Sequence, residues 1–599
     1  MRGFGVRKLG RFRRPVPGWL GVAPALATAA LMVACGQANS NDTGISRSPD
    51  ANAGTAGAGA TSGSAPHAAA GQAQAGGSAG GSGPASGGTA ATEDCEETAI
   101  APRLVRLTLD QLAASVEALL GSDARTAAVQ EVPVPSLAER AFPPLTAPHE
   151  GTAFTDTSFA STDRFARAVA DYVLENVAEV TGCGASPTEE CALAFLESFA
   201  ERAYRRPTVP AERGELAQVL EESLGHEATV AEATANVVYS IFSSPSFLYR
   251  TEFGEAATAP ARRLSGLERA SQLSYFITNA PPDDELLDVA ATGGLGVEAE
   301  LDAQIARLLE TPAGKNNFET ALASAFGAQR LKDIVLDPSL FPEFNVDLQR
   351  AMLLEAESFI RSHLWGEAAE GLLTARESRV NAALASLYGI PFPPSGADVD
   401  AEGFADVQFP PERAGILGVA GLLTSKSRPD GVSIIVRGLW VNRLVCNIVS
   451  APDPEFDESI DPDLQNGTPR EQANERMAAP RCTKCHSVID PYGLALEAFD
   501  AIGRYDANVD ASATLFSPPV EVASAAEMSE AIADSGLFGD CLTRWFLSFA
   551  LSEGVSPVAN TCAARAINTA RRADGDRSFA GIVRRIARSE QIVERTDSP

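Results

Sequence analysis

The sequence predicts an all-α protein in which several packed helical modules follow a disordered N-terminal tether. Apolar residues recur at helical spacing in many segments, whereas sustained alternation of apolar and polar residues, the pattern of a half-buried strand, is rare. Gly, Ala and Ser dominate the chain from Cys35 to about residue 92, and such a composition has almost nothing to bury. Roughly 500 residues follow this region, which is enough for two to four packed units.

The N-terminus has the layout of a bacterial export signal. Six basic residues and no acidic residue precede Trp19, and an apolar run then extends to Ala34. This run ends before Cys35, as in a lipoprotein signal, in which the cysteine is lipidated and becomes the first mature residue. We therefore expect a lipoprotein signal peptide at residues 1–34. An uncleaved anchor helix and ordinary signal cleavage are the alternatives, and all three export the chain.

Residues 35–94 are predicted to be the lipidated cysteine and a Gly/Ala/Ser-rich disordered linker, which as a coil would span on the order of 45 Å. The whole chain has a net charge of −30, and removing the six basic residues of the signal brings it to about −36. A surface this acidic repels nucleic acid and attracts basic partners. We expect a lipid-anchored protein of the bacterial cell envelope, at the outer membrane or the periplasmic face.

The first predicted helix of the ordered region, at 108–121, shows both of its ends. Thr108 and Gln111 have the spacing of a capping box, an apolar stripe follows, and Gly121 suits the helix end. Further apolar stripes predict helices at 195–204, 301–309, 348–364 and 541–551. We assign the ordered chain to four modules, with these bounds: 95–255, 256–405, 406–510 and 511–599.

Three polar clusters along the chain have simpler explanations than a binding site. The run Pro281-Pro282-Asp283 is more typical of a helix start than of a metal site. The arginines of ERAYRRP, at 201–207, are more typical of a helix C-terminal turn than of an anion site. The acidic run at 453–463 lacks the spacing of a calcium-binding loop and is predicted to be a solvated linker.

Cys482, Cys485 and His486 form a C-x-x-C-H motif in a chain that has only nine cysteines and five histidines. Covalent c-type haem uses this motif, because two thiols can add to the haem vinyl groups while the adjacent histidine becomes an axial iron ligand. A dithiol redox pair is typically found at a helix start beside a parallel sheet, and a zinc site needs further cysteine or histidine ligands at similar spacing. Neither pattern is present, so the sequence predicts one covalently bound haem c.

The C-x-x-C-H motif does not specify the sixth iron ligand, which has to be predicted from other residues. Met528 lies 42 residues after His486, a distance typical of a cytochrome methionine, although a methionine on an apolar helix face is more often core filler. Residues farther away in the sequence stay open as alternatives, namely Met352, His149, His226 and His363. A filled sixth position favours electron transfer, and an open one favours chemistry on oxygen or peroxide.

The six cysteines outside the lipid site and the motif predict three disulfides, because an even number remains in an oxidising compartment. Six cysteines allow fifteen pairings. Short separations favour two of them, and the third follows by elimination, which gives Cys183 with Cys191, Cys541 with Cys562, and Cys95 with Cys446.

Several phrases carry a resemblance, in order from about Arg103 to Glu553: RLTLDQLAASVEALLG, FAERAYRRP, SSPSFLYRTEF, LSYFITNAPPDDELL, RESRVNAALASLYG, CTKCHSVIDPYGLALEAFDAIGRY and CLTRWFLSFALSE. With them the chain resembles large exported proteins of planctomycetes and myxobacteria, which consist of consecutive domains of unknown function and a cytochrome-c-like C-terminal portion. The resemblance implies helical modules and a haem-type motif at Cys482, Cys485 and His486. Two departures are Arg476, where relatives often have histidine, and Thr278, where they commonly have tryptophan.

The function expected from the sequence is electron transfer to or from an unidentified redox partner. A haem-dependent enzyme of the oxidase or peroxidase type is the first alternative, and a haem-free, disulfide-stabilised binding or scaffold lipoprotein is the second. Outside the Gly/Ala/Ser-rich linker, where GGSAG at 76–80 matches G-x-S-x-G by composition alone, the sequence contains no G-x-S-x-G, and it contains no H-E-x-x-H, no phosphate loop and no dinucleotide fingerprint. It therefore gives no indication of hydrolase or nucleotide chemistry.

Overall fold

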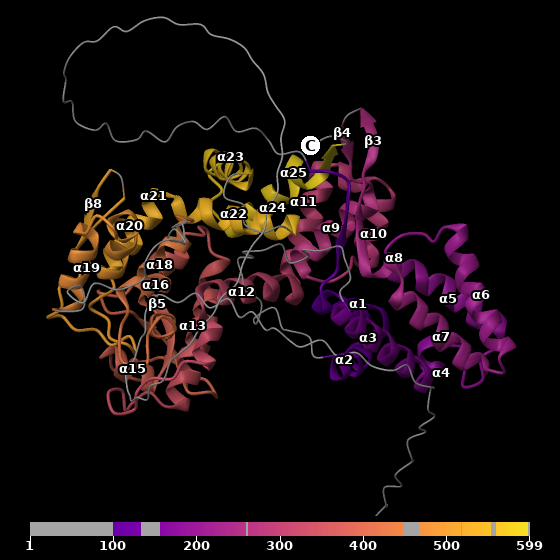
Figure 1. Cartoon of the computed structure of the whole chain (residues 1–599), viewed down its shortest axis with the longest axis horizontal. Coiled ribbons are helices and arrows are strands. Elements are labelled where there is room, and N and C mark those ends of the chain that lie inside the picture. The colour runs from indigo at the N-terminus through magenta and orange to yellow at the C-terminus, as the bar shows by residue number, and fades with distance from the viewer. Residues whose placement is uncertain are drawn as a thin grey trace, which may run out of the picture. The chain divides into compact units, whose positions relative to one another are not determined.

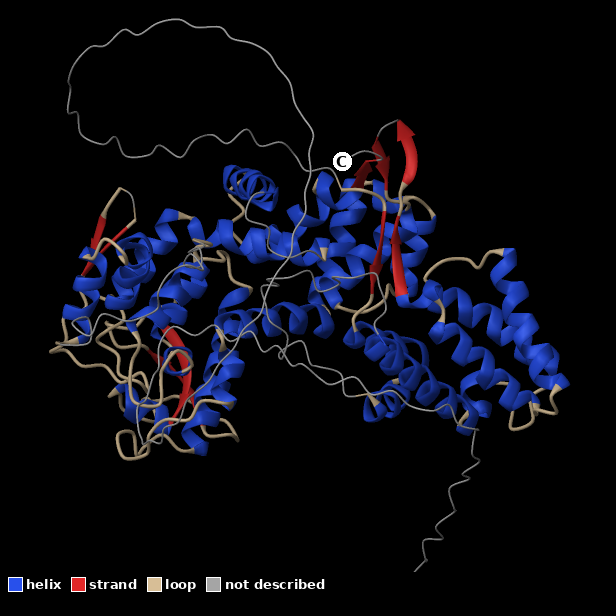
Figure 2. Cartoon of the chain, in the orientation of Figure 1, coloured by secondary structure: helices blue, strands red, loops and turns tan. Residues whose placement is uncertain are grey.

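The computed structural model describes residues 100–132, 156–258, 261–447, 467–516, 518–552 and 559–596, all of which belong to one compact unit. Helices dominate these residues, and the strands among them are short (Figure 2). The prediction of an all-α fold is confirmed. The predicted signal peptide, Cys35, the linker, Cys95, His149 and the acidic run at 453–463 lie outside the described residues.

The first hydrophobic core is built by the helices between residues 109 and 248. They are α1 (Leu109–Leu120), α2 (Ser122–Glu131), α3 (Asp156–Glu175), α4 (Val177–Thr181), α5 (Glu189–Tyr204), α6 (Pro210–Gly225), α7 (Val230–Ser243) and α8 (Pro245–Leu248). The capping box predicted for α1 is present, with Thr108 as the N-cap and Gln111 as its partner. Helix α7 packs against α3, α5 and α6, and Phe242 on α7 contacts the rings of Phe199 and Phe247.

The second hydrophobic core takes residues from all three predicted modules after residue 256. Its larger helices are α9 (Gly266–Thr278), α10 (Asp284–Ala291), α11 (Glu298–Glu310), α12 (Pro312–Phe326), α13 (Val346–Leu364), α18 (Ile434–Leu444), α19 (Pro469–Ala478), α20 (Thr483–Leu494), α21 (Ala525–Ser535), α22 (Leu537–Leu551), α23 (Ala559–Ala573) and α24 (Phe579–Arg588). Its short ones are η2 (Gly294–Gly296), η3 (Ala328–Lys332), α14 (Gly371–Thr374), α15 (Ala382–Tyr388), α16 (Gly415–Gly418), α17 (Ala420–Thr424) and α25 (Glu590–Val593). Phe318 of α12 contacts the rings of Trp365, Phe546 and Phe579, which joins α12 to α22 and α24.

The strands form four small antiparallel sheets that tie distant segments together. The pairs are β1 (Arg103–Arg106) with β2 (Tyr249–Glu252), β5 (Glu377–Asn381) with β6 (Phe404–Gln408), and β7 (Ala513–Leu515) with β8 (Val520–Val522). The three-stranded sheet has the order β3 (Glu255–Thr258), β4 (Ala261–Arg263) and β9 (Glu594–Thr596). Strand β9 therefore brings the end of the described chain back to the junction between the two cores.

A buried ion cluster at Glu252 stabilises this junction. The Glu252 carboxylate is fully buried and accepts from Arg103 at 2.8 Å, from Arg250 at 2.6 Å and from Arg595. Burial alone would raise the pKa of Glu252, but the three guanidinium groups outweigh it and hold this pKa at about 2. The cluster links β1, β2 and β9.

A second buried carboxyl group, Glu355 on α13, has no arginine in direct contact. It accepts hydrogen bonds from the hydroxyl of Ser378 at 2.9 Å and from the hydroxyl of Tyr388 at 2.7 and 2.8 Å. The Arg413 guanidinium lies over the Tyr388 ring, 4.1 Å from its centroid. Burial raises the pKa of Glu355 to about 7, although the hydroxyl groups and Arg413 act in the opposite direction.

We expect Glu355 to make the fold less stable as the pH rises from about 5 to about 8. In the folded chain this carboxyl keeps its proton up to about pH 7, whereas in the unfolded chain it ionises near its ordinary value of 4.5, so folding retains a proton in this window. Glu355→Gln should flatten this part of the profile of Tm against pH, an effect of at most a few kcal/mol. The control is Glu521→Gln on an exposed position of β8. Parallel profiles for the two variants in scanning calorimetry would contradict the expectation.

Candidate functional site

The C-x-x-C-H motif lies at the start of α20. Cys482 is the residue that precedes the helix, and Cys485 and His486 lie in its first turn. The backbone N–H of His486 donates to the carbonyl of Cys482 at 3.0 Å, so the helical turn holds all three side chains within one short stretch of backbone. Both sulfurs are half-buried free thiols that are not joined to each other.

His486 is oriented by a buried carboxylate one turn further along the same helix. Its Nδ1 lies 3.0 Å from Oδ1 of Asp490, a residue with no exposed surface. The other carboxylate oxygen, Oδ2, accepts from Nε of Arg476 on α19 at 2.9 Å. With Nδ1 directed at Asp490, Nε2 is the ring nitrogen that can take a ligand role. Arg476 was expected only as a departure from relatives, and Asp490 was not predicted, although its i, i+4 spacing from His486 indicates a contact between the two side chains.

Helix α20 packs most extensively against α18, and its other neighbours include α19 and β7; these helices lie together in Figure 1. Two glycines allow α18 and α20 to approach closely. A Cβ atom at Gly438 of α18 would collide with the carbonyl oxygen of Ile489, and one at Gly493 of α20 would collide with that of Ile434. The backbone of the motif helix α20 therefore packs in direct contact with the backbone of α18.

The segment after the motif helix is fixed by Arg437, a fully buried residue of α18. Its guanidinium donates to the carbonyl oxygens of Leu496 at 2.9 Å, Phe499 at 2.5 Å and Asp500 at 2.7 Å. Burial lowers the pKa of Arg437 to about 9. One buried guanidinium thus donates to three carbonyl groups and holds residues 496–500 against α18.

Met528 is also fully buried, on α21. The principal neighbours of α21 are α14, α16, α22 and β8, whereas those of α20 are α18, α19 and β7. The elements that carry Met528 and His486 therefore have different main neighbours. Among the alternatives for the sixth ligand, Met352 is fully buried on α13, His226 caps the end of α6, and His363 Nε2 lies 3.0 Å from the carbonyl of Glu377.

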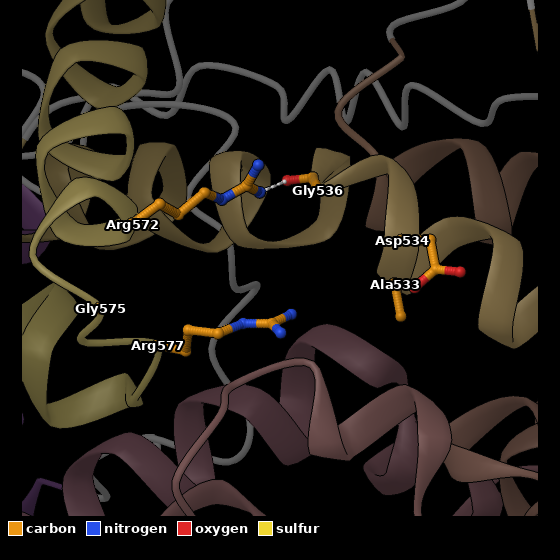
Figure 3. Close-up of a pocket in the computed structure, with 6 residues that line it drawn as sticks. All are labelled: Ala533, Asp534, Gly536, Arg572, Gly575 and Arg577. Carbon is orange, nitrogen blue, oxygen red and sulfur yellow. Dashed lines mark hydrogen bonds between the residues drawn. The ribbon is translucent and has the colours of Figure 1, made fainter.

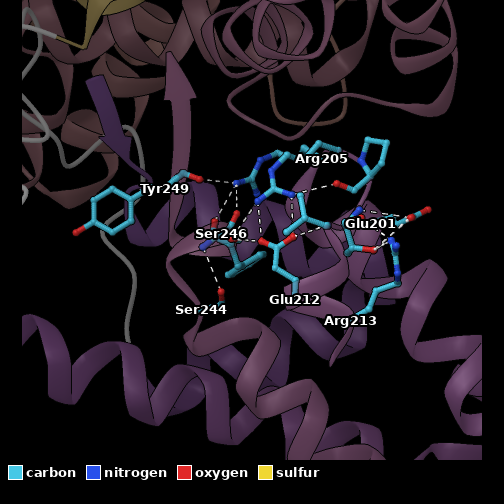
Figure 4. Close-up of polar contacts among 12 residues, drawn as sticks. Glu201, Arg205, Glu212, Arg213, Ser244, Ser246 and Tyr249 are labelled. Atoms are coloured by element: carbon cyan, nitrogen blue, oxygen red, sulfur yellow. Dashed lines mark hydrogen bonds and ion pairs between the residues drawn. The ribbon is translucent and has the colours of Figure 1, made fainter. Parts of the chain in front are cut away.

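Two of the three arginines of the ERAYRRP segment, Arg205 and Arg206, make contacts within the fold, whereas Arg202 is exposed (Figure 4). Arg205 ends α5 in the left-handed conformation, and its guanidinium donates to the carbonyl oxygens of Ala203, Ser246, Phe247 and Tyr249. Arg206 forms two hydrogen bonds with the Glu212 carboxylate, at 2.9 and 2.7 Å. The segment is a helix C-terminus, as the sequence predicted. The helix start near residue 281 is also present, but Asp283 is the N-cap of α10 and the two prolines precede the helix.

A cavity of about 270 Å³ lies away from the motif, and Figure 3 shows the residues that line it. These are Ala533, Asp534, Gly536, Arg572, Gly575 and Arg577. Arg572 donates to the carbonyl of Gly536 at 2.7 Å, and Arg577 lies 3.7 Å from the buried carboxylate of Glu370. The cavity is lined by the end of α21, by Gly536 between α21 and α22, by the end of α23 and by the connection between α23 and α24, and no residue of the C-x-x-C-H motif lines it.

Of the three predicted disulfide pairings, one is present and two are wrong. Cys183 is bonded to Cys191, as expected from their short separation. Cys446, just after α18, is bonded to Cys541 in the first turn of α22, with a Cα–Cα distance of 5.2 Å. The predicted pairs Cys541–Cys562 and Cys95–Cys446 are therefore wrong, because packing of α18 on α22 brings together cysteines 95 positions apart. Cys562 is also in a disulfide, and its partner lies outside the described residues.

The described residues contain neither a cluster of metal ligands nor a membrane-spanning helix. Within them, no group of three or more His, Cys, Asp and Glu side chains is placed to hold a metal ion. None of the helices from α1 to α25 is long and apolar enough to span a bilayer. The disulfides are typical of a protein that folds in an oxidising compartment.

Three protein-family models match consecutive segments of the chain. They are PSD5, "Protein of unknown function (DUF1595)", at residues 191–252; PSD4, "Protein of unknown function (DUF1592)", at 264–390; and PSCyt3, "Protein of unknown function (DUF1588)", at 413–508. Each match falls within one of the predicted modules, and the third contains the C-x-x-C-H motif. No curated protein and no solved structure matches the chain.

We expect Arg437→Met to destabilise the region after the motif helix strongly, because three carbonyl groups lose the buried guanidinium as a donor. The expected loss is about 3 kcal/mol or more in the free energy of unfolding. The matched control is Arg504→Met, since Arg504 is exposed and pairs with Glu343 on the surface, where the loss should be about 1 kcal/mol or less. Urea unfolding measures both values. If the two variants unfold alike, Arg437 does not have the role described above.

Proposed function

We propose that this chain is a cell-envelope lipoprotein that carries one covalent c-type haem and exchanges single electrons with a redox partner. The observation that carries the proposal is the donor set at the start of α20. Two free thiols three residues apart are followed by a histidine whose Nδ1 is fixed by a buried carboxylate. The name of the family model that matches residues 413–508, PSCyt3, supports a cytochrome-like module there.

The donor chemistry fits a c-type haem. Cys482 and Cys485 would hold the porphyrin through two thioether bonds, and His486 would hold the iron through Nε2. When bound, the haem supplies a reversible one-electron couple. The chain's own contribution is rigidity: α20 rests on α18 through Gly438 and Gly493, and Arg437 fixes the segment that follows. A site on rigid elements changes little when the charge at its centre changes, which favours electron transfer.

Compartment and charge support the rest of the proposal. Haem c is attached outside the cytoplasm, and the disulfides Cys183–Cys191 and Cys446–Cys541 indicate an oxidising compartment of this kind. Lipidation of Cys35 would keep the protein at a membrane surface, beside other membrane-bound electron carriers. The strongly acidic chain would attract a basic redox protein, and this attraction should weaken as salt is added.

The haem itself is tested on full-length protein exported in cells that contain a haem-ligation system. We expect a pyridine haemochrome spectrum typical of two thioether links, in a ratio of one haem to one chain. Cys482→Ser with Cys485→Ser should abolish covalent haem, whereas Cys183→Ser with Cys191→Ser removes a disulfide of the first core and should leave the haem content unchanged. Wild-type protein that matures without haem under these conditions contradicts the proposal and leaves the binding or scaffold function.

The sixth iron ligand is tested by Met528→Leu, a substitution of similar volume. Met528 stays the prediction from the sequence, but its burial on α21 and the neighbours of that helix favour a packing role. We therefore expect an unchanged visible spectrum and a loss of less than about 1.5 kcal/mol in stability. If the reduced variant instead gains the ability to bind carbon monoxide, Met528 is the ligand and the expectation is wrong.

A further inference from the structure

Three side chains form a hydrogen-bonded chain at the Nδ1 edge of the His486 ring. His486 Nδ1, the Asp490 carboxylate and Arg476 Nε are joined at 3.0 and 2.9 Å. The Asp490 side chain has no exposed surface, and the side chains of Arg476 and His486 are only 15% and 20% exposed. Water therefore competes weakly for these two contacts.

The way in which Asp490 divides its oxygen atoms indicates a role beyond pairing with an arginine. A carboxylate buried only to pair with arginine favours the two parallel bonds of the guanidinium fork. Asp490 instead accepts from Nε of Arg476 through Oδ2, and its Oδ1 faces Nδ1 of His486. Asp490 thus holds the ring in place, and Arg476 from the neighbouring helix holds Asp490.

We propose that Asp490 is a positioning residue that fixes the Nδ1–H tautomer of His486 and strengthens Nε2 as an electron donor to the haem iron. This inference rests on the proposed function. A carboxylate that accepts from Nδ1–H increases the basicity of the ring more than a neutral carbonyl does, and a more basic axial ligand stabilises ferric over ferrous iron. The reduction potential is therefore lower than it would be with a neutral partner. Arg476 limits the effect, because it draws charge from the same carboxylate.

Reduction potentials of the full-length haem protein test the inference. Asp490→Asn keeps the size of the side chain and an oxygen acceptor but removes the charge, so the potential should become more positive. The matched control is Glu497→Gln, which removes a half-buried carboxylate just after α20 that interacts with Arg470 at 3.4 Å. If loss of negative charge alone caused the shift, the reduction potentials of both variants would rise by the same amount. We expect a clearly larger positive shift for Asp490→Asn, and a negative shift for Arg476→Gln.

A second measurement does not depend on haem. Nitrogen-15 NMR of histidine-labelled, haem-free protein reports the tautomer of the neutral His486 ring. We expect a single Nδ1–H form in the wild type and a mixture in Asp490→Leu, whereas Asp490→Asn, which keeps an oxygen acceptor, should retain the Nδ1–H form. Failure of the wild type to take up haem would overturn the proposed function while this measurement still decides the role of Asp490. Equal potential shifts for Asp490→Asn and Glu497→Gln, or an unchanged tautomer in Asp490→Leu, would overturn the inference.

Discussion

The contact between His486 Nδ1 and the buried carboxylate of Asp490 is the interaction on which the candidate site depends. A histidine at the start of a helix could turn to either side, and its two ring nitrogens could exchange roles. The carboxylate removes this freedom, because it is fixed from its other side by Arg476. The motif then presents two thiols and Nε2 from one helical turn, which is the arrangement that a covalent haem requires.

The surroundings of the motif make this turn rigid in two further ways. Close contact of α18 and α20 requires glycine at 438 and 493, since any larger residue would push the helices apart. Buried arginines also donate to backbone carbonyl groups around the motif helix: Arg437 holds residues 496–500, and Arg413 donates to the carbonyls of Gly418 and Gly503. A buried guanidinium suits this task because it has five donors in a fixed plane. The helical body before the motif contacts these arginines through Tyr388, over whose ring Arg413 lies.

Local signals predicted the local parts of the structure well. The capping box of α1, the apolar stripes of α11, α13 and α22, and the Cys183–Cys191 bond all arise from residues close together in the sequence. The errors concern distant contacts. Cys541 pairs with Cys446 because two helices pack, and no spacing rule contains that information. The role of Arg437 was missed for the same reason, since its three acceptors lie about sixty residues further along. Asp490 could have been found from its spacing alone.

Peptide mass spectrometry of the exported protein shows whether the two cysteines of the motif are bonded to haem. We expect the peptide containing Cys482 and Cys485 to carry the mass of one haem after maturation with a haem-ligation system, and reducing agents should not release it. A peptide in which these sulfurs are free or joined to each other would rule out a covalent haem c.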